Sequence, residues 1–155
     1  MKKGTRRALW LGIAGAALFA LFVVWSFQTY LAGGAAVGEP LPRFFLYTLE
    51  GGPVTLDRWR GTPVILRLSS VGCTACADDF ELLDALQADL GGEALVVAVQ
   101  VGDTAAGVRG ALRGRTVGAP VLLDPAGEAA NALGLRFVPG VYFVTSRGTL
   151  SSVAT

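Results

Sequence analysis

One stretch decides the fold: VILRLSSVGCTACADDFELLDALQADL, residues 64–90. Residues 64–70 form an apolar run of strand length that is rich in branched side chains, which predicts a buried strand. Phe80, Leu83 and Leu86 then recur at helical spacing with acidic residues between them, which predicts a helix. Cys73 and Cys76 lie where the strand gives way to the helix.

This position of the two cysteines has chemical consequences. The N-terminus of a helix presents unpaired N–H groups and about half a positive charge, and both favour a thiolate over a thiol. Cys73 is therefore the predicted nucleophile. Cys76 follows three residues later, on the same helix face and within reach of a disulfide, which suits a resolving cysteine. A Cys-x-x-Cys in a chain with no other cysteine is typical of a redox pair.

The composition excludes several kinds of site. The chain has 155 residues, the length of a single domain, and contains no histidine, so Ser-His-Asp and Cys-His mechanisms are absent. Two cysteines alone cannot complete a tetrahedral zinc site, and a redox disulfide needs no cofactor. Beyond residue 7, nine arginines stand against twelve acids, a net charge of −3, which gives no basic surface for nucleic acid.

The N-terminal segment has the pattern of a membrane protein. Residues 1–7 carry four positive charges and residues 8–31 are uncharged and mostly apolar, long enough to span a bilayer of about 30 Å. Because basic residues stay inside, we expect a cytoplasmic segment at 1–7, a transmembrane anchor at 8–31, a small-residue linker at 32–42 and an extracytoplasmic domain at 43–155. A cleaved signal peptide, ending in the small residues of 31–36, is the alternative. In either case the domain leaves the cytoplasm, where a disulfide can persist.

The remaining patterns predict an α/β fold with a mixed central sheet between helices. Two hairpins are expected, an N-terminal one from residues 43–48 and 53–56 and a closing one from 141–145 and 149–153. Between them we expect strands at 94–101 and 120–123, and helices at 104–115 and 128–133. Phe44, Phe45 and Trp59 are expected in the core.

Several segments together resemble a known family. Besides the anchor and the Cys-x-x-Cys, these are residues 37–44, 52–61 and 120–128, and the pair Val138-Pro139 before an apolar strand. Over residues 37–150 the chain is similar to the membrane-anchored TlpA and ResA type of thiol–disulfide oxidoreductase, in the redoxin (AhpC/TSA) superfamily. The resemblance implies a thioredoxin-like fold on the outer side of a bacterial cytoplasmic membrane, held by a single-pass helix.

The resemblance also implies a reaction and further site residues. It implies that the protein reduces disulfides in exported proteins such as apocytochrome c, with a role in cytochrome c biogenesis or antioxidant activity. A membrane-embedded thiol reductant would then restore the Cys73–Cys76 dithiol. Pro139 matches the family's cis-proline packed against the redox pair, and Val138 matches the residue that helps dock the substrate backbone.

Three positions depart from the family pattern. Gly72 and Ala75 replace the usual Trp and Pro beside the cysteines, so the direction of electron flow stays open. Arg67 falls where thioredoxins carry a buried acid. If Arg67 points inward it needs a carboxylate partner and favours a nearby thiolate, as a pKa-tuning residue; otherwise it extends to solvent. We expect Asp78 and Asp79 to complement the helix dipole.

Two other functions fit part of the pattern. Ser70 and Cys73 have the Ser-x-x-Cys spacing of peroxiredoxins, and Arg136 could orient a peroxide, so a thiol peroxidase is the first alternative. Two soft thiolates could instead hold Cu(I) for delivery as a copper chaperone. The copper chaperones of this fold use Cys-x-x-x-Cys and a histidine, which this chain lacks.

Overall fold

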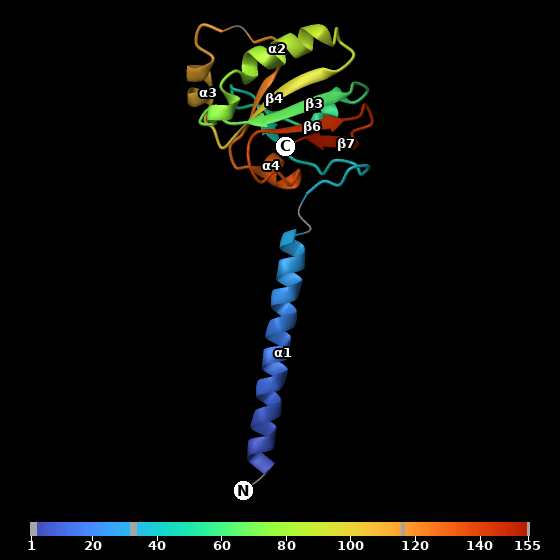
Figure 1. Ribbon diagram of the computed structural model, residues 1–155, viewed down its shortest axis with the longest axis vertical. Coiled ribbons are helices and arrows are strands. Elements are labelled where there is room, and N and C mark those ends of the chain that lie inside the picture. Colours follow the sequence, from blue (N-terminus) through green and yellow to red (C-terminus); the bar gives the residue numbers. More distant parts are fainter. Residues whose placement is uncertain (1–2, 32–33, 116, 155) are drawn as a thin grey trace. The chain divides into compact units, whose positions relative to one another are not determined.

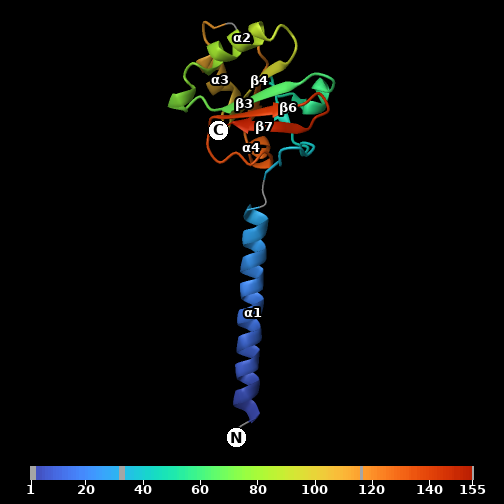
Figure 2. The same cartoon turned by 45° about the vertical axis from the view of Figure 1, so that its right-hand side comes forward.

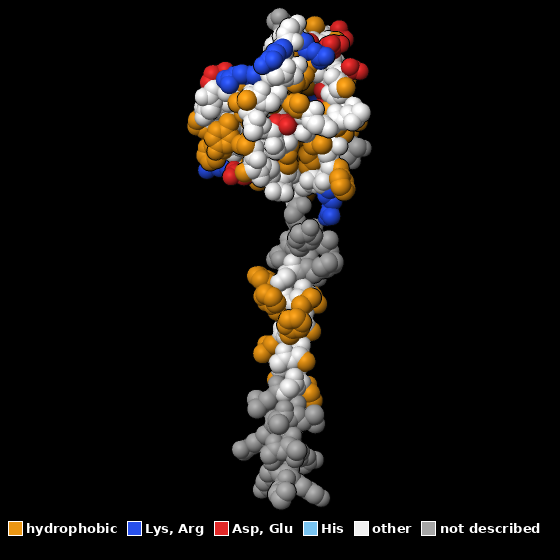
Figure 3. Space-filling model, turned by 90° about the vertical axis from the view of Figure 1, so that its left-hand side faces the viewer, with side chains coloured by type: hydrophobic (Ala, Val, Ile, Leu, Met, Phe, Trp, Pro, Cys, Tyr) orange, Lys and Arg blue, Asp and Glu red, His pale blue; other side chains and the backbone are white. Residues whose placement is uncertain are grey.

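The computed structural model describes residues 3–31, 34–115 and 117–154 (Figure 1). The chain divides into two compact units, with the boundary between Gly33 and Gly34. The first unit is the helix α1, Lys3–Leu31. From Gly12 to Trp25 the residues of this helix are exposed. Hydrophobic side chains are prominent on the face of this stretch in Figure 3.

Among the described residues, no helix reaches the combined length and apolarity that crossing a membrane demands. The anchor at residues 8–31 therefore stays a prediction.

The second unit is built on a seven-stranded sheet with the strand order β2-β1-β5-β4-β3-β6-β7. The strands are β1 Leu46–Tyr47, β2 Pro53–Val54, β3 Val64–Ser69, β4 Leu95–Val101, β5 Val121–Asp124, β6 Gly140–Val144 and β7 Leu150–Ala154. The helices are α2 Asp79–Asp89, α3 Ala105–Ala111 and α4 Glu128–Ala132, with 3-10 turns η1 Leu56–Trp59 and η2 Thr74–Cys76.

The sheet is mixed, as the sequence predicted. β3, β4 and β5 run parallel, with Leu66 beside Val97 and Val99 beside Leu122. The remaining pairings are antiparallel, including the two hairpins β1–β2 and β6–β7. Parallel strands buried on both faces need apolar residues throughout, which explains the nearly unbroken apolar runs of β3 and β4.

Helices cover the two faces of the sheet, α2 and α3 on one and α4 on the other (Figures 1 and 2). Phe80 and Leu83 of α2 pack with Val108 of α3 in one apolar cluster. Ala129 and Ala130 of α4 pack in the other. The side chains of β3 alternate between these clusters, because successive residues of a strand face opposite sides.

Two expectations about this unit were wrong. The helix expected at 104–115 ends at Ala111, and Gly114 just beyond it has φ +75°, a conformation that ends helices. Phe45 is not in the core: its side chain is 53% exposed, while Phe44 is buried. The two phenylalanines are neighbours in the segment before β1, and Phe44 is the one that packs in the apolar cluster with Leu46. Trp59 is half-buried against the core.

Candidate active site

Cys73 and Cys76 form a disulfide in the connection between β3 and α2, with their Cα atoms 5.2 Å apart. Cys73 caps the 3-10 turn η2, and the N–H of Cys76 donates to the carbonyl of Cys73 at 3.0 Å. The cysteines therefore lie in a short turn before the helix rather than in its first turn, because α2 begins only at Asp79.

Hydrogen bonds hold the loop that carries Cys73. The N–H of Cys73 donates to the carbonyl of Ser70 at 3.0 Å. The N–H of Val71 donates to Asp103 Oδ2 at 2.8 Å, which ties the loop to the segment after β4. The disulfide is thus positioned by contacts with two neighbouring strand ends.

The two sulfur-bearing residues differ in exposure. Cys73 is half-buried, whereas Cys76 is 8% exposed. Cys76 lines a small cleft of about 150 Å³ together with Ser69, Asp79 and Gln100. A substrate disulfide approaching from solvent therefore meets Cys73 first.

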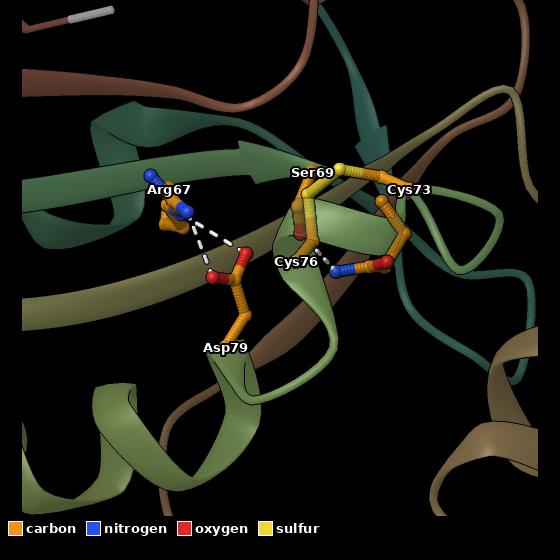
Figure 4. Close-up of polar contacts among 6 residues, drawn as sticks. Arg67, Ser69, Cys73, Cys76 and Asp79 are labelled. Carbon is orange, nitrogen blue, oxygen red and sulfur yellow. Dashed lines mark hydrogen bonds and ion pairs between the residues drawn. A yellow bond between two sulfur atoms is a disulfide. The ribbon is translucent and has the colours of Figure 1, made fainter.

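Arg67 points inward and pairs with Asp79 (Figure 4). Its Nε donates to Asp79 Oδ2 at 3.0 Å and its Nη2 donates to Oδ1 at 2.7 Å. The side chains are 17% and 7% exposed. This bidentate geometry is the strongest form of an arginine–carboxylate contact, and it decides between the two orientations that the sequence left open.

Asp79 is the residue near the disulfide whose environment the sequence reasoning misjudged. We expected ordinary first-turn charge, but its side chain is buried and lines the cleft with Cys76. A signal was present, because Asp79 shares a helix face with Leu83 and Leu86 at i+4 and i+7. Asp78, by contrast, is exposed and lies at the N-cap of α2.

A second buried polar pair lines the same cleft as Cys76. Gln100 Nε2 donates to Ser69 Oγ at 2.8 Å, and both residues are at most 2% exposed. Sequence reasoning overlooked this pair, although Gln100 interrupts an otherwise apolar strand. Ser69 ends β3 and pairs with Gln100 across the parallel ladder, so the strand register places the two side chains together.

Val138 and Pro139 precede β6, and the peptide bond between them is cis, as the resemblance implied. Gly140 pairs with Leu68 of β3, so Pro139 lies beside the end of β3 from which the cysteine loop departs. Both residues are half-buried. Arg136 is exposed.

Within the described residues, no group of three or more metal-ligating side chains is present. A wider, mostly apolar cleft of about 340 Å³ includes Phe44, Trp59 and Val64. Val64 begins β3, so this cleft lies at the end of the strand opposite the disulfide.

The fold and the site define a thioredoxin-like protein whose Cys-x-x-Cys disulfide stands between a parallel strand and a helix, the arrangement of a thiol–disulfide oxidoreductase. The chain belongs to the AhpC/TSA family, whose model matches residues 37–153. The predicted class, a thioredoxin-like thiol–disulfide oxidoreductase, is thereby confirmed. A comparison with curated proteins found no match to the sequence.

Solved structures support the fold. The chain is similar to a putative thiol:disulfide interchange protein DsbE from Chlorobium tepidum, with a TM-score of 0.71 and 22% identity over 79% of this chain and 86% of that one. It is also similar to the exposed lipoprotein thioredoxin Etrx1 of Streptococcus pneumoniae, with a TM-score of 0.63 and 23% identity over 73% and 88% of the chains. A third similar structure is a secreted disulfide oxidoreductase of Mycobacterium tuberculosis. Its TM-score is 0.62 and its sequence identity 18%, over 72% of this chain and 81% of that one.

Proposed function

We propose that this protein reduces disulfide bonds in exported proteins, outside the cytoplasm, as a TlpA- or ResA-like oxidoreductase. One observation carries the proposal: a half-buried Cys73 is joined to a buried Cys76 at a strand-to-helix turn. This asymmetry separates an attacking sulfur that substrates can reach from a resolving sulfur that they cannot.

The reaction follows from the two positions. In the reduced protein the Cys73 thiolate attacks one sulfur of the substrate disulfide, a mixed disulfide forms and the first substrate thiolate leaves. The Cys76 thiolate then attacks Cys73 Sγ, and the second substrate thiolate leaves. Two electrons pass from the cysteine pair to the substrate. A dithiol reductant must then reduce the Cys73–Cys76 disulfide before the next reaction. Val138 and Pro139 hold the substrate backbone beside Cys73.

The Arg67–Asp79 pair tunes this exchange. Arg67 alone would favour a thiolate at Cys76, whereas Asp79 lines the same cleft as Cys76 and opposes it. Because the two charges are paired at 2.7 Å, each offsets the other near the sulfur. The balance between them sets how readily the disulfide accepts electrons.

The location of the reaction is part of the same proposal. Four basic residues precede an uncharged stretch in α1, and the described side chains of this helix are largely exposed apolar groups. This pattern supports a single-pass anchor at residues 8–31 with the domain on the extracytoplasmic side of a bacterial membrane. Apocytochrome c then becomes a natural substrate and a membrane-embedded thiol reductant a natural electron donor.

Insulin reduction by the full-length protein in detergent tests the proposal. We expect turnover with dithiothreitol as electron donor and its complete loss in Cys73→Ser. Cys76→Ser should instead accumulate a mixed disulfide between Cys73 and insulin, visible by mass under non-reducing conditions. Full activity in Cys73→Ser would exclude Cys73 as the nucleophile. Rapid consumption of peroxide without insulin reduction would favour the peroxidase alternative, and a stoichiometric Cu(I) complex would favour the copper chaperone.

A further inference from the structure

Phe137 is unusually exposed for an aromatic residue. Its side chain is 84% exposed, more than any other large hydrophobic residue that the structure describes. One exposed hydrophobic side chain is ordinary on a protein surface, so what singles out Phe137 is its position beside the site. Phe137 lies directly before Val138 and Pro139, the residues that face the approaching substrate in the proposed reaction.

The segment around Phe137 is anchored at both ends. On one side, Leu135 packs against the core and its N–H donates to the carbonyl of Ala130 at 2.8 Å. On the other side, Gly140 is buried and pairs with Leu68 of β3. Only four residues separate these anchors, so the backbone at Phe137 belongs to a short connection that is tied down on both sides.

The position relative to the cysteines defines what the ring can touch. Pro139 lies beside the end of β3, and the chain continues from that end through Val71 to Cys73. Val71 is itself 42% exposed. A substrate segment whose disulfide meets Cys73 and whose backbone lies along Val138 and Pro139 would pass the ring of Phe137 one or two residues from its cysteine.

We propose that Phe137 is a specificity-determining residue that binds an aliphatic or aromatic side chain of the substrate protein close to the disulfide being reduced. This inference rests on the proposed function, because it assigns a sequence preference to that same reaction. The partner is an unfolded or loosely folded segment, since such side chains are buried in a folded protein.

The test compares two peptide disulfides with full-length protein in detergent. In each peptide the single cysteine is joined to glutathione by a disulfide, and glutathione is the leaving thiol. The peptides differ only at the second residue before the cysteine, which is Leu in one and Ser in the other. The measured quantity is the ratio of second-order reduction rates, Leu peptide over Ser peptide. We expect a ratio of about ten in the wild type, which corresponds to about 1.4 kcal/mol of contact energy. The oxidised form of 2-mercaptoethanol serves as a disulfide without a peptide.

Variants test whether the preference for the Leu peptide comes from the Phe137 side chain. Phe137→Ser should bring the ratio close to one, and Phe137→Leu should restore most of it because an apolar contact remains. Phe45→Ser is the matched control, since Phe45 is another exposed phenylalanine but lines the cleft at the end of β3 opposite the disulfide, and it should keep the ratio of the wild type.

The outcomes separate this inference from the proposed function. A wild-type ratio of one, or a ratio of ten that survives in Phe137→Ser, would overturn the role of Phe137 while leaving disulfide reduction intact. A ratio that falls equally in Phe45→Ser would also overturn it. Failure of the wild type to reduce even oxidised 2-mercaptoethanol would instead contradict the proposed function.

Discussion

At the scale of single residues, the buried pair of Arg67 and Asp79 is the charged feature of the site. From sequence alone, Arg67 could be recognised as unusual because a charge interrupts an apolar strand. Its partner could not be chosen, because the chain between the two residues, which are twelve positions apart, turns through a loop whose path only tertiary packing fixes. The sequence therefore predicted a carboxylate partner only for an inward-pointing Arg67, and it identified neither the orientation nor the partner.

Removal of either partner should destabilise the fold. Arg67→Met leaves a buried carboxylate and Asp79→Asn leaves a buried guanidinium, each at a cost of about 3 kcal/mol, the low end for a buried pair because Arg67 keeps 17% exposure. The double variant should recover part of this loss. Urea unfolding of all four proteins measures the coupling, and strictly additive losses would show that the two charges do not interact.

The same variants should move the reduction potential in opposite directions. Asp79→Asn leaves the positive charge, which favours a thiolate and raises the potential, whereas Arg67→Met leaves the negative charge and lowers it. Equal shifts of one sign would mean that the variants act by loosening the structure rather than by charge.

Tyr142 gives a prediction about alkaline pH. Desolvation by burial raises the pKa of the Tyr142 phenol above its usual value of 10.0. The unfolded chain therefore releases this proton at a lower pH than the folded one. The contribution of Tyr142 to the free energy of unfolding is fully present below about pH 10 and is lost as the pH rises through the folded pKa. Tyr142→Phe should flatten this alkaline fall in the free energy of unfolding. An unchanged slope would contradict the assignment.

At the scale of elements, strands and helices were predicted well where side-chain periodicity is strong. β3, β4 and the order of the two hairpins were predicted because apolar strands and turn residues leave clear patterns. The helix ends were predicted less well. The delayed start of α2 follows from the turn that closes the disulfide, and the short α3 follows from its glycines, neither of which changes the apolar pattern.

The connection between α4 and β6 depends on one glycine. A Cβ at Gly140 would lie 2.6 Å from Leu135 Cδ1 and 3.2 Å from Tyr142 Cε2. Gly140→Ala should therefore force Leu135 aside and cost about 1–2 kcal/mol. Thermal unfolding measures this loss, and an unchanged melting temperature would show that Leu135 adjusts freely.

A glycine in open space provides the control for that variant. Gly110 lies within α3, and a Cβ added there would meet no neighbouring atom within 4 Å. Gly110→Ala should therefore stabilise the protein by up to about 1 kcal/mol, because alanine favours a helix more than glycine does. The opposite signs of the two substitutions separate close packing from backbone entropy.

At the scale of the whole molecule, the domain bounds from the sequence stay a prediction, and the second compact unit begins before the predicted domain start at residue 43. The structure separates the chain between Gly33 and Gly34, within the predicted small-residue linker at 32–42. The family model begins at residue 37, inside the predicted linker rather than after it. Buried polar pairs such as Ser69–Gln100 could not be predicted, because they depend on strand register across the assembled sheet.

The most direct test of the central claim is a redox titration of the full-length protein, in glutathione and dithiothreitol buffers, with thiol alkylation counted by mass. We expect one two-electron transition in which Cys73 and Cys76 change together, with a midpoint near or below about −230 mV, the range of a reductant. A midpoint near about −120 mV would mark an oxidant and contradict the proposed direction of electron flow. If the two cysteines never form a disulfide at any potential, the protein is not a thiol–disulfide oxidoreductase.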